Sequence, residues 1–327
     1  MTPPWGWPRT NAMHHLAKQV LRVLLILGTG MGCKQSQTPT VHNPRRETQP
    51  TIVVEPPDEF VDPIRFVADP IDLLNIGSFA RDVALRQAQL PKEPGAVDCR
   101  PVSNSNVPGT FLCLSKSIEA QNRLFTRASN YSEGSRFTTA GYLIPFDHMG
   151  YVDYVEHIWG HDIPSDRLIP FFAEAEEEDD YEQHETCGMN PSEREFGKNV
   201  LGALIQFSKG KPFVVITAFS DLRPEDLLGV VSHEAIHAQY FLSEPIRQAV
   251  EAFWDHELSD EERTSALSDL GDFYDIDNRF VVLNEFLAYM AAYGPARSVG
   301  IAAARKSEFI AYVERRSGIP LFRYPER

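Results

Sequence analysis

The chain has 327 residues, 43% of them hydrophobic, and a formal net charge of −15 at pH 7. This length and composition are sufficient for one large hydrophobic core or two moderate ones. The acidic balance argues against nucleic acid as a partner, because phosphate binding requires a basic face and the sequence shows none.

The first 33 residues have the features of a targeting segment. Basic residues flank or enter a short apolar run, 20–27, which gives way to small residues and Cys33. The run is too short to span a bilayer as a mature helix, and small residues at its end suit cleavage. Gly32–Cys33 resembles the end of a bacterial lipoprotein signal, in which the cysteine is lipidated. The resemblance implies a lipid anchor at the periplasmic or surface side of the cell envelope; secretion and an uncleaved anchor are the alternatives.

Residues 34–58 are rich in Gln, Thr, Pro and charge and have no apolar periodicity. Such a segment cannot bury enough apolar surface to offset the entropy of ordering it, so we expect a disordered tether. The folded part is expected to begin near Glu59. We divide it into an N-terminal part, 59–200, and a C-terminal part, 201–327, which carries the motif described below.

The N-terminal part begins with a mixed pattern. The sequence predicts a helix over 71–89, a strand over 110–115 and a helix over 116–130. Cys99 and Cys113 bracket a loop rich in Pro, Gly, Ser and Asn. In an exported chain, two cysteines at this spacing favour a disulfide over a metal-binding pair.

Aromatic residues are frequent from 137 to 172, which indicates a core or the wall of a cleft, with a substrate-binding wall as the alternative. His157 and His161 are four residues apart, but Gly160 between them weakens a helix and no third ligand is nearby, so we expect no metal site there. The acidic run 174–180 is interpreted as a solvated loop; a calcium site or a contact for a basic substrate side chain is the alternative.

Two β-rich runs, 201–207 and 213–219, are separated by the turn residues Ser208–Pro212. This pattern predicts a β-hairpin. Capping residues, Pro224 and two acids then mark the start of a helix predicted over 224–241.

The second half of that helix contains the motif His233-Glu234-x-x-His237. Residues four apart lie on one helix face, so His233 and His237 can offer two imidazoles to one metal ion. Glu234 lies on the neighbouring flank, from which its carboxylate can act on water without binding the metal. A catalytic zinc site requires a third protein ligand.

The best third ligand is Glu285, in an apolar segment predicted as a helix over 278–293. A lone carboxylate in such a helix is unfavourable to bury unless it is paired or bound to metal. A structural Glu with a protein partner is the alternative.

His233-Glu234-x-x-His237 followed by Asn284-Glu285-x-x-Ala288 resembles the gluzincin metallopeptidases, typified by thermolysin and the zinc aminopeptidases, over about a quarter of the chain. The resemblance implies one Zn²⁺ held by His233, His237 and Glu285, with Glu234 as general base. It implies hydrolysis of a peptide or protein substrate.

The expected fold is α+β and zincin-like. A small sheet with an edge hairpin packs on the active-site helix, and a helical subdomain follows. In such enzymes the strand before the active helix pairs with extended substrate, and we assign this role to Phe213–Ala218.

An oxyanion stabiliser is also expected. Tyr289, one turn after Glu285, is a candidate, and His256 and Tyr293 are others. His256, Asp275 and Asp277 are alternative partners for a ligand imidazole.

Two alternatives compete with this interpretation. Cys187 precedes the motif helix in a setting similar to the metal-binding cysteine of peptide deformylases, so it competes with Glu285 as third ligand. The second alternative is that the chain is a lipid-anchored, non-catalytic binding module that keeps a zinc site. The presence of Glu234 counts against that module, because a structural site needs no such carboxylate.

Three further helices are predicted in the C-terminal part, over 243–257, 259–274 and 300–316. The second begins with a capping box at Ser259, and the third ends at Gly318.

Overall fold

The computed structural model describes residues 64–73, 96–103, 106–134, 140–144, 158–179, 188–292 and 303–324. The chain divides into two units, 1–58 and 59–327, and every described residue belongs to the second. Cys33, Cys187 and most of the helix predicted over 71–89 lie outside the described residues. No helix of the described part is long and apolar enough to cross a membrane.

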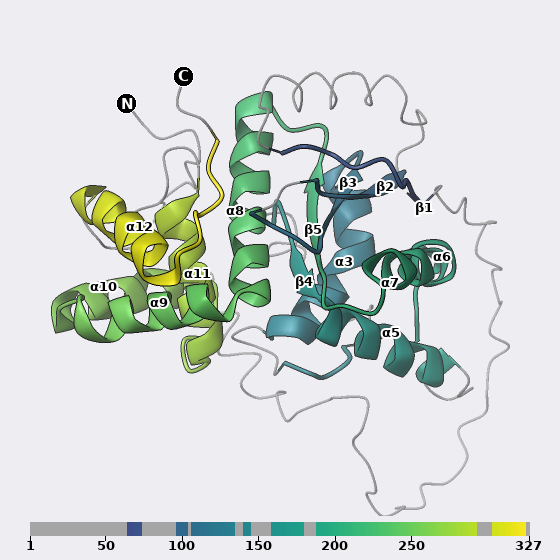
Figure 1. Cartoon of the computed structure of the whole chain (residues 1–327). Coiled ribbons are helices and arrows are strands. Elements are labelled where there is room, and N and C mark those ends of the chain that lie inside the picture. The colour runs from purple at the N-terminus through teal and green to yellow at the C-terminus, as the bar shows by residue number, and fades with distance from the viewer. Residues whose placement is uncertain are drawn as a thin grey trace, which may run out of the picture. The chain divides into compact units, whose positions relative to one another are not determined.

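The described residues form an α+β fold around a five-stranded mixed sheet (Figure 1). Its strands are β1 (Ile64–Phe66), β2 (Val97–Pro101), β3 (Thr110–Ser115), β4 (Asp162–Pro164) and β5 (Val214–Phe219). Their spatial order is β1-β2-β3-β5-β4. The β1–β2 and β3–β5 pairs are parallel, and the β2–β3 and β4–β5 pairs are antiparallel. Every residue of β3 and β5 is buried, as expected for strands that are covered on both faces.

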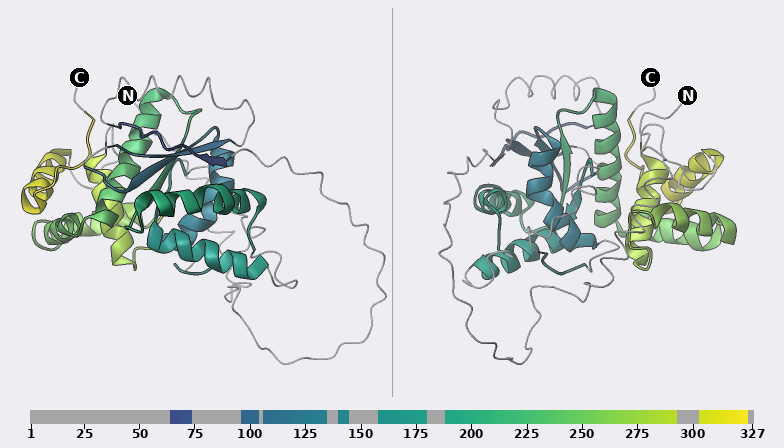
Figure 2. Two further views of the ribbon diagram at one scale, coloured as in Figure 1. Left: turned by 45° about the vertical axis from the view of Figure 1, so that its right-hand side comes forward. Right: turned by 180° about the vertical axis from the view of Figure 1, so that it is seen from behind.

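Helices cover both faces of this sheet (Figure 2). On one face α3 (Ile118–Glu133) contacts β3 and β5, and α5 (Ser165–Asp179) and α6 (Pro191–Phe196) pack against α3. On the other face α8 (Pro224–Leu242) packs against β5. Beyond α8 lies a helical region of α9 (Glu244–His256), α10 (Asp260–Leu270), α11 (Arg279–Ala291) and α12 (Ala303–Ser317). Helix α8, which carries the His233-Glu234-x-x-His237 motif, is therefore enclosed between the sheet and α11.

Most of the predicted elements are present with small shifts of their ends. The strand over 110–115 is β3, and the helices over 116–130, 224–241, 243–257, 259–274, 278–293 and 300–316 are α3 and α8–α12. The capping box at the start of α10 is also present, because Ser259 accepts from the N–H of Glu262 and the Glu262 side chain accepts from the N–H of Ser259.

The predicted edge hairpin is wrong in its first strand. Residues 202–208 form helix α7, which continues α6 through a π-helical turn at Gly197–Leu201. The capping box at Asn190 starts this helical run, and extending an existing helix is easier than starting a new element. Leu201–Phe207 is too short for its apolar pattern to separate strand from helix.

The second strand is present as β5, but it is not an edge. β3 pairs with one side of β5, and β4 pairs with the other side along Val214–Ile216. The assignment of Phe213–Ala218 as the strand that pairs with substrate is therefore wrong, because its hydrogen-bonding groups already have partners in the sheet. The outer strand on this side is β4.

The acidic run is another correction. Glu174–Asp179 is the last part of α5 and not a solvated loop. Ala175 is fully buried, and the hydroxyl of Tyr131 donates to Glu174 Oε1 at 2.8 Å. The Glu and Ala residues are good helix formers, and Phe171 and Phe172 anchor the helix in the core.

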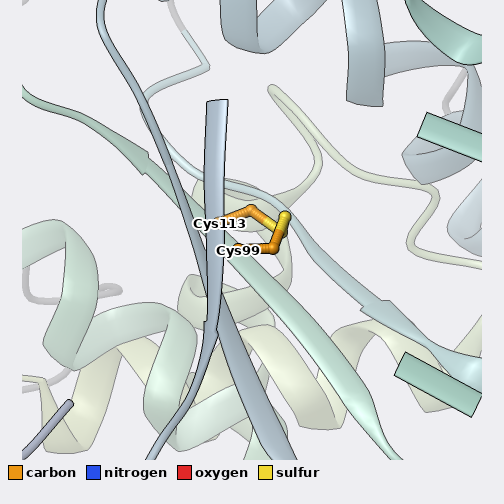
Figure 3. Close-up of a disulfide and its surroundings, with 2 residues drawn as sticks. All are labelled: Cys99 and Cys113. Carbon is orange, nitrogen blue, oxygen red and sulfur yellow. A yellow bond between two sulfur atoms is a disulfide. The ribbon is translucent and has the colours of Figure 1, made fainter. Parts of the chain in front are cut away.

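The structure contains the predicted disulfide (Figure 3). Cys99 on β2 lies directly opposite Cys113 on β3, and both residues are fully buried. The bond closes a loop with a sequence separation of 14. It therefore joins two neighbouring strands at the centre of the sheet.

Candidate metal centre

Two imidazoles project from one face of α8. His233 and His237 are one helical turn apart, and their ring centroids are separated by 4.6 Å. Because α8 packs between β5 and α11, His237 is only 1% exposed. The side chain of His233 keeps 19% of its surface exposed, so it is the more accessible of the two.

α11 brings Glu285 to both imidazoles. Nε2 of His233 is 3.7 Å from Oε2 of Glu285, and Nε2 of His237 is 3.7 Å from Oε1. The ligand-type atoms of the three residues all lie within 4.8 Å of one another. With metal–ligand bonds of about 2.0–2.2 Å, the ligand atoms of a tetrahedral site lie about 3.3–3.6 Å apart. The group therefore fits one metal ion with little adjustment.

The electrostatics of this triad favour a bound cation. Burial lowers the pKa of both His233 and His237 to about 4, so the imidazoles are neutral at pH 7 and present lone pairs. Burial raises the pKa of Glu285, and its Oε2 atom is buried without a hydrogen-bond partner among the described residues. A buried polar atom without a partner is unfavourable, and a divalent cation would satisfy all three side chains.

Glu234 follows His233 in α8 but is not part of the triad. Its side chain is buried and packs against Gly160, where an added Cβ would lie 2.4 Å from Oε1 of Glu234. Burial raises the pKa of Glu234, and the charges of Asp162 and Glu285 raise it further. A carboxyl oxygen of Glu234 lies within 4.8 Å of one of Asp162. Glu234 thus lies beside the triad without belonging to the group of His233, His237 and Glu285.

Sequence analysis missed two acids beside this site, the buried Asp162 and the half-buried Glu133. Asp162, the first residue of β4, forms a second group with Glu234 and His237, whose ligand-type atoms also lie within 4.8 Å of one another. Glu133 ends α3, and burial, followed by the charge of Asp162, raises its pKa. A single acid within a short apolar strand is a signal for Asp162, but nothing in its spacing relates it to α8.

Of the predicted oxyanion stabilisers, Tyr289 is near the triad. Its ring meets that of His233 edge to face with 4.9 Å between centroids, and its hydroxyl is 3.2 Å from that of Tyr274. Tyr274 in turn hydrogen-bonds to Glu285. His256 is exposed at the end of α9 and belongs to neither group of metal-type side chains, and Tyr293 lies outside the described residues.

Asp275 and Asp277, which the sequence suggested as partners for a ligand imidazole, belong to neither group of metal-type side chains. Asp275 accepts from the N–H of Asp277 in the loop before α11, and Asp277 is exposed. His161 is 2% exposed and lies against Asn122, with 3.3 Å between its Nε2 atom and Oδ1. Among the residues that the structure describes, metal-type side chains gather in threes only in the two groups above, so neither His161 nor the acidic run forms a further group.

The chain is thus an α+β protein with a buried His-His-Glu group that could hold a metal ion. It matches no protein-family model, no curated protein and no solved structure.

Proposed function

We propose that this chain is a zinc-dependent peptidase of gluzincin type. The observation that carries the proposal is the arrangement of four side chains. His233, His237 and Glu285 converge on one point, while Glu234 stays beside them with its own contacts. Three protein ligands and an uncommitted carboxyl group are the composition of a catalytic zinc site; a structural site normally has four protein ligands.

The ligand set also bears on the choice of metal. Two imidazoles and one carboxylate suit Zn²⁺, and the same set also holds Fe²⁺ in some proteins. The adjacent Glu234 favours a hydrolytic metal, because hydrolysis requires a group that accepts and returns a proton.

The chain's own residues then have distinct tasks in peptide hydrolysis. A bound zinc ion would supply a Lewis acid that polarises a carbonyl group and lowers the pKa of water towards about 7. Neutral His233 and His237, with Glu285, would hold it. Glu234 takes a proton from the attacking water as the new C–O bond forms, and returns that proton to the amine nitrogen as the C–N bond breaks. Burial, together with the charges of Asp162 and Glu285, raises the pKa of Glu234, and the charge of a bound cation would oppose that shift.

Tyr289 is our candidate for stabilising the developing oxyanion, because it lies against His233, the more accessible ligand.

For the substrate we propose an extended chain along the outer edge of β4. Trp159 and Gly160 precede β4 and are partly exposed, and Gly160 touches Glu234. Backbone pairing with this edge would bring a peptide bond next to the base.

The test compares Glu234→Gln with wild type. We expect both proteins to bind one zinc per chain, since Glu234 is not a ligand. We expect peptide cleavage to fall by about 10²–10⁴-fold, the usual contribution of general acid–base catalysis. Equal cleavage by both proteins, or a zinc-loaded wild type that cleaves nothing in a broad peptide library, would favour the non-catalytic binding module.

We also propose that the chain is held at a bacterial cell envelope by a lipid on Cys33. This rests on the sequence of the first 33 residues, which lie outside the described part. Exported wild type should partition into detergent, whereas Cys33→Ala should stay in the aqueous phase. A wild-type protein that is fully soluble after export would support secretion instead.

A further inference from the structure

Asp162 lies close to three residues of the candidate centre, on the two helices α8 and α11. It is 5% exposed and is the first residue of the outer strand β4. Its Oδ2 atom is 3.8 Å from Nδ1 of His237 on α8 and 3.5 Å from Nδ2 of Asn284 on α11. A carboxyl oxygen of Asp162 also lies within 4.8 Å of one of Glu234.

The sheet holds Asp162 in place. In the register of β4 and β5, Asp162 lies opposite Ile216. The flanking residue His161 donates its N–H to Oγ1 of Thr217 at 2.9 Å, and its carbonyl accepts from the N–H of Thr217 at 2.8 Å. A carboxyl group carried by a paired strand is more closely positioned than one on a loop.

His237 needs a partner of this kind. Its Nε2 atom faces Glu285 and its Nδ1 atom faces Asp162. An imidazole that binds metal through Nε2 carries its proton on Nδ1, and that proton requires an acceptor. In the described part of the chain, Nδ1 of His237 is buried without a hydrogen-bond partner, and 3.8 Å is longer than a hydrogen bond. A small movement of the ring or the carboxylate would close this gap.

Among the described residues, the other titratable groups that act on Asp162 are acids and the imidazole of His237. Glu133 approaches from α3, Glu234 from α8 and Glu285 from α11. An experiment must therefore distinguish two effects of Asp162 on cation binding: acceptance of a hydrogen bond from His237, and the attraction of its negative charge.

We propose that Asp162 is a positioning residue that orients two groups of the centre, His237 through Nδ1–H and Glu234 through the close approach of the two carboxyl groups. The Glu234 half rests on the proposed peptidase function. The His237 half concerns metal binding alone, so it is tested without any peptide.

The first measurement is zinc affinity by chelator competition, on wild type and on Asp162→Ala, Asp162→Asn and Asp166→Asn. Loss of the partner of a ligand imidazole typically weakens metal binding about 10–100-fold, which we expect for Asp162→Ala. Asp162→Asn keeps an oxygen that accepts from Nδ1–H, so it should recover most of the affinity. Asp166 is exposed in the first turn of α5, so its variant should bind as wild type does. If Ala and Asn at 162 weaken binding equally, the effect is one of charge and the proposal is wrong; it is also wrong if neither changes affinity.

The second measurement, nuclear magnetic resonance of His237, tests the proposal even if Asp162→Ala does not fold. In the zinc-loaded wild type, nuclear magnetic resonance should show the Nδ1 proton of His237 protected and far downfield, as for a charge-assisted hydrogen bond. Asp162→Asn should move this signal upfield, and Asp166→Asn should leave it in place. A signal insensitive to Asp162→Asn would overturn the proposal.

The two hypotheses fail in different ways. A protein that binds zinc with the expected dependence on Asp162 but cleaves no peptide removes the peptidase function and leaves Asp162 as the partner of His237. If cleavage is found, Asp162→Ala should lower kcat more than it raises KM, because a misplaced Glu234 acts on the chemical step.

Discussion

Gly160 and Glu234 pack so closely that any side chain at position 160 would collide with the carboxyl group of the proposed base. A Cβ atom built on Gly160 would lie 2.4 Å from Oε1 and 2.7 Å from Cδ of Glu234. The sequence shows Gly160 only as a weak point between two histidines, whereas the fold uses its lack of a side chain to make room beside the metal centre.

We therefore expect Gly160→Ala to displace Glu234 and reduce peptide cleavage by about 10²-fold, the typical effect of misplacing a reacting group by about 1 Å. Zinc content should not change, because Glu234 is not one of the proposed ligands. Gly202→Ala is the matched control, since it is in a helix with no atom within 4 Å of the added Cβ, and it should keep activity. Full activity in Gly160→Ala would mean that the position of Glu234 is unimportant.

The third ligand is tested by metal content. Glu285→Ala removes the carboxylate that faces both imidazoles, so most bound zinc should be lost. Cys187→Ser should retain zinc, and so should Glu251→Ala, an exposed acid on α9. Zinc retained by Glu285→Ala but lost from Cys187→Ser would support the deformylase-like alternative. Inductively coupled plasma mass spectrometry of the purified variants provides the measurement.

Metal affinity should depend on pH through a carboxyl group and not through the imidazoles. The pKa of His233 and His237 is about 4, so their protons do not compete above about pH 5. Burial raises the pKa of Glu285, so its proton must be displaced by the metal at any pH below that raised value. Affinity should therefore fall as the pH is lowered from neutrality towards 5. Calorimetry in buffers of different ionisation enthalpy should detect proton release, and affinity that stays constant over this range would contradict the prediction.

The disulfide should support stability without supporting the metal centre. Closing a loop of about 15 residues is worth about 3 kcal/mol in the chain-entropy model, so Cys99→Ala with Cys113→Ala should lower the free energy of unfolding by about that amount. Zinc stoichiometry should be unchanged, because the bond joins β2 to β3 and the proposed ligands are on α8 and α11. Denaturant titration and zinc analysis of the same samples test both statements, and loss of zinc in the folded variant would show a coupling that we do not expect.

Sequence patterns located the triad because its determinants are local. The four-residue spacing of His233 and His237 places both on one face of any helix, whatever the surrounding fold. Glu285 was recognisable because an acid in an apolar helix needs a partner. The capping box at Ser259 and the proline at the start of α8 likewise marked helix ends that the structure has.

What only the tertiary structure decided are the relations between segments far apart in the sequence. Strand order is one such relation. A buried apolar run such as Val214–Phe219 has the same sequence pattern whether the strand lies in the middle of a sheet or at a covered edge. The region around Glu234 is another: Gly160 precedes the outer strand β4, Asp162 begins it, and Glu133 comes from the end of α3. Their roles follow from packing β4 against β5 beside α8, and a carboxyl group carries no sequence mark of the side chains that it will meet after folding.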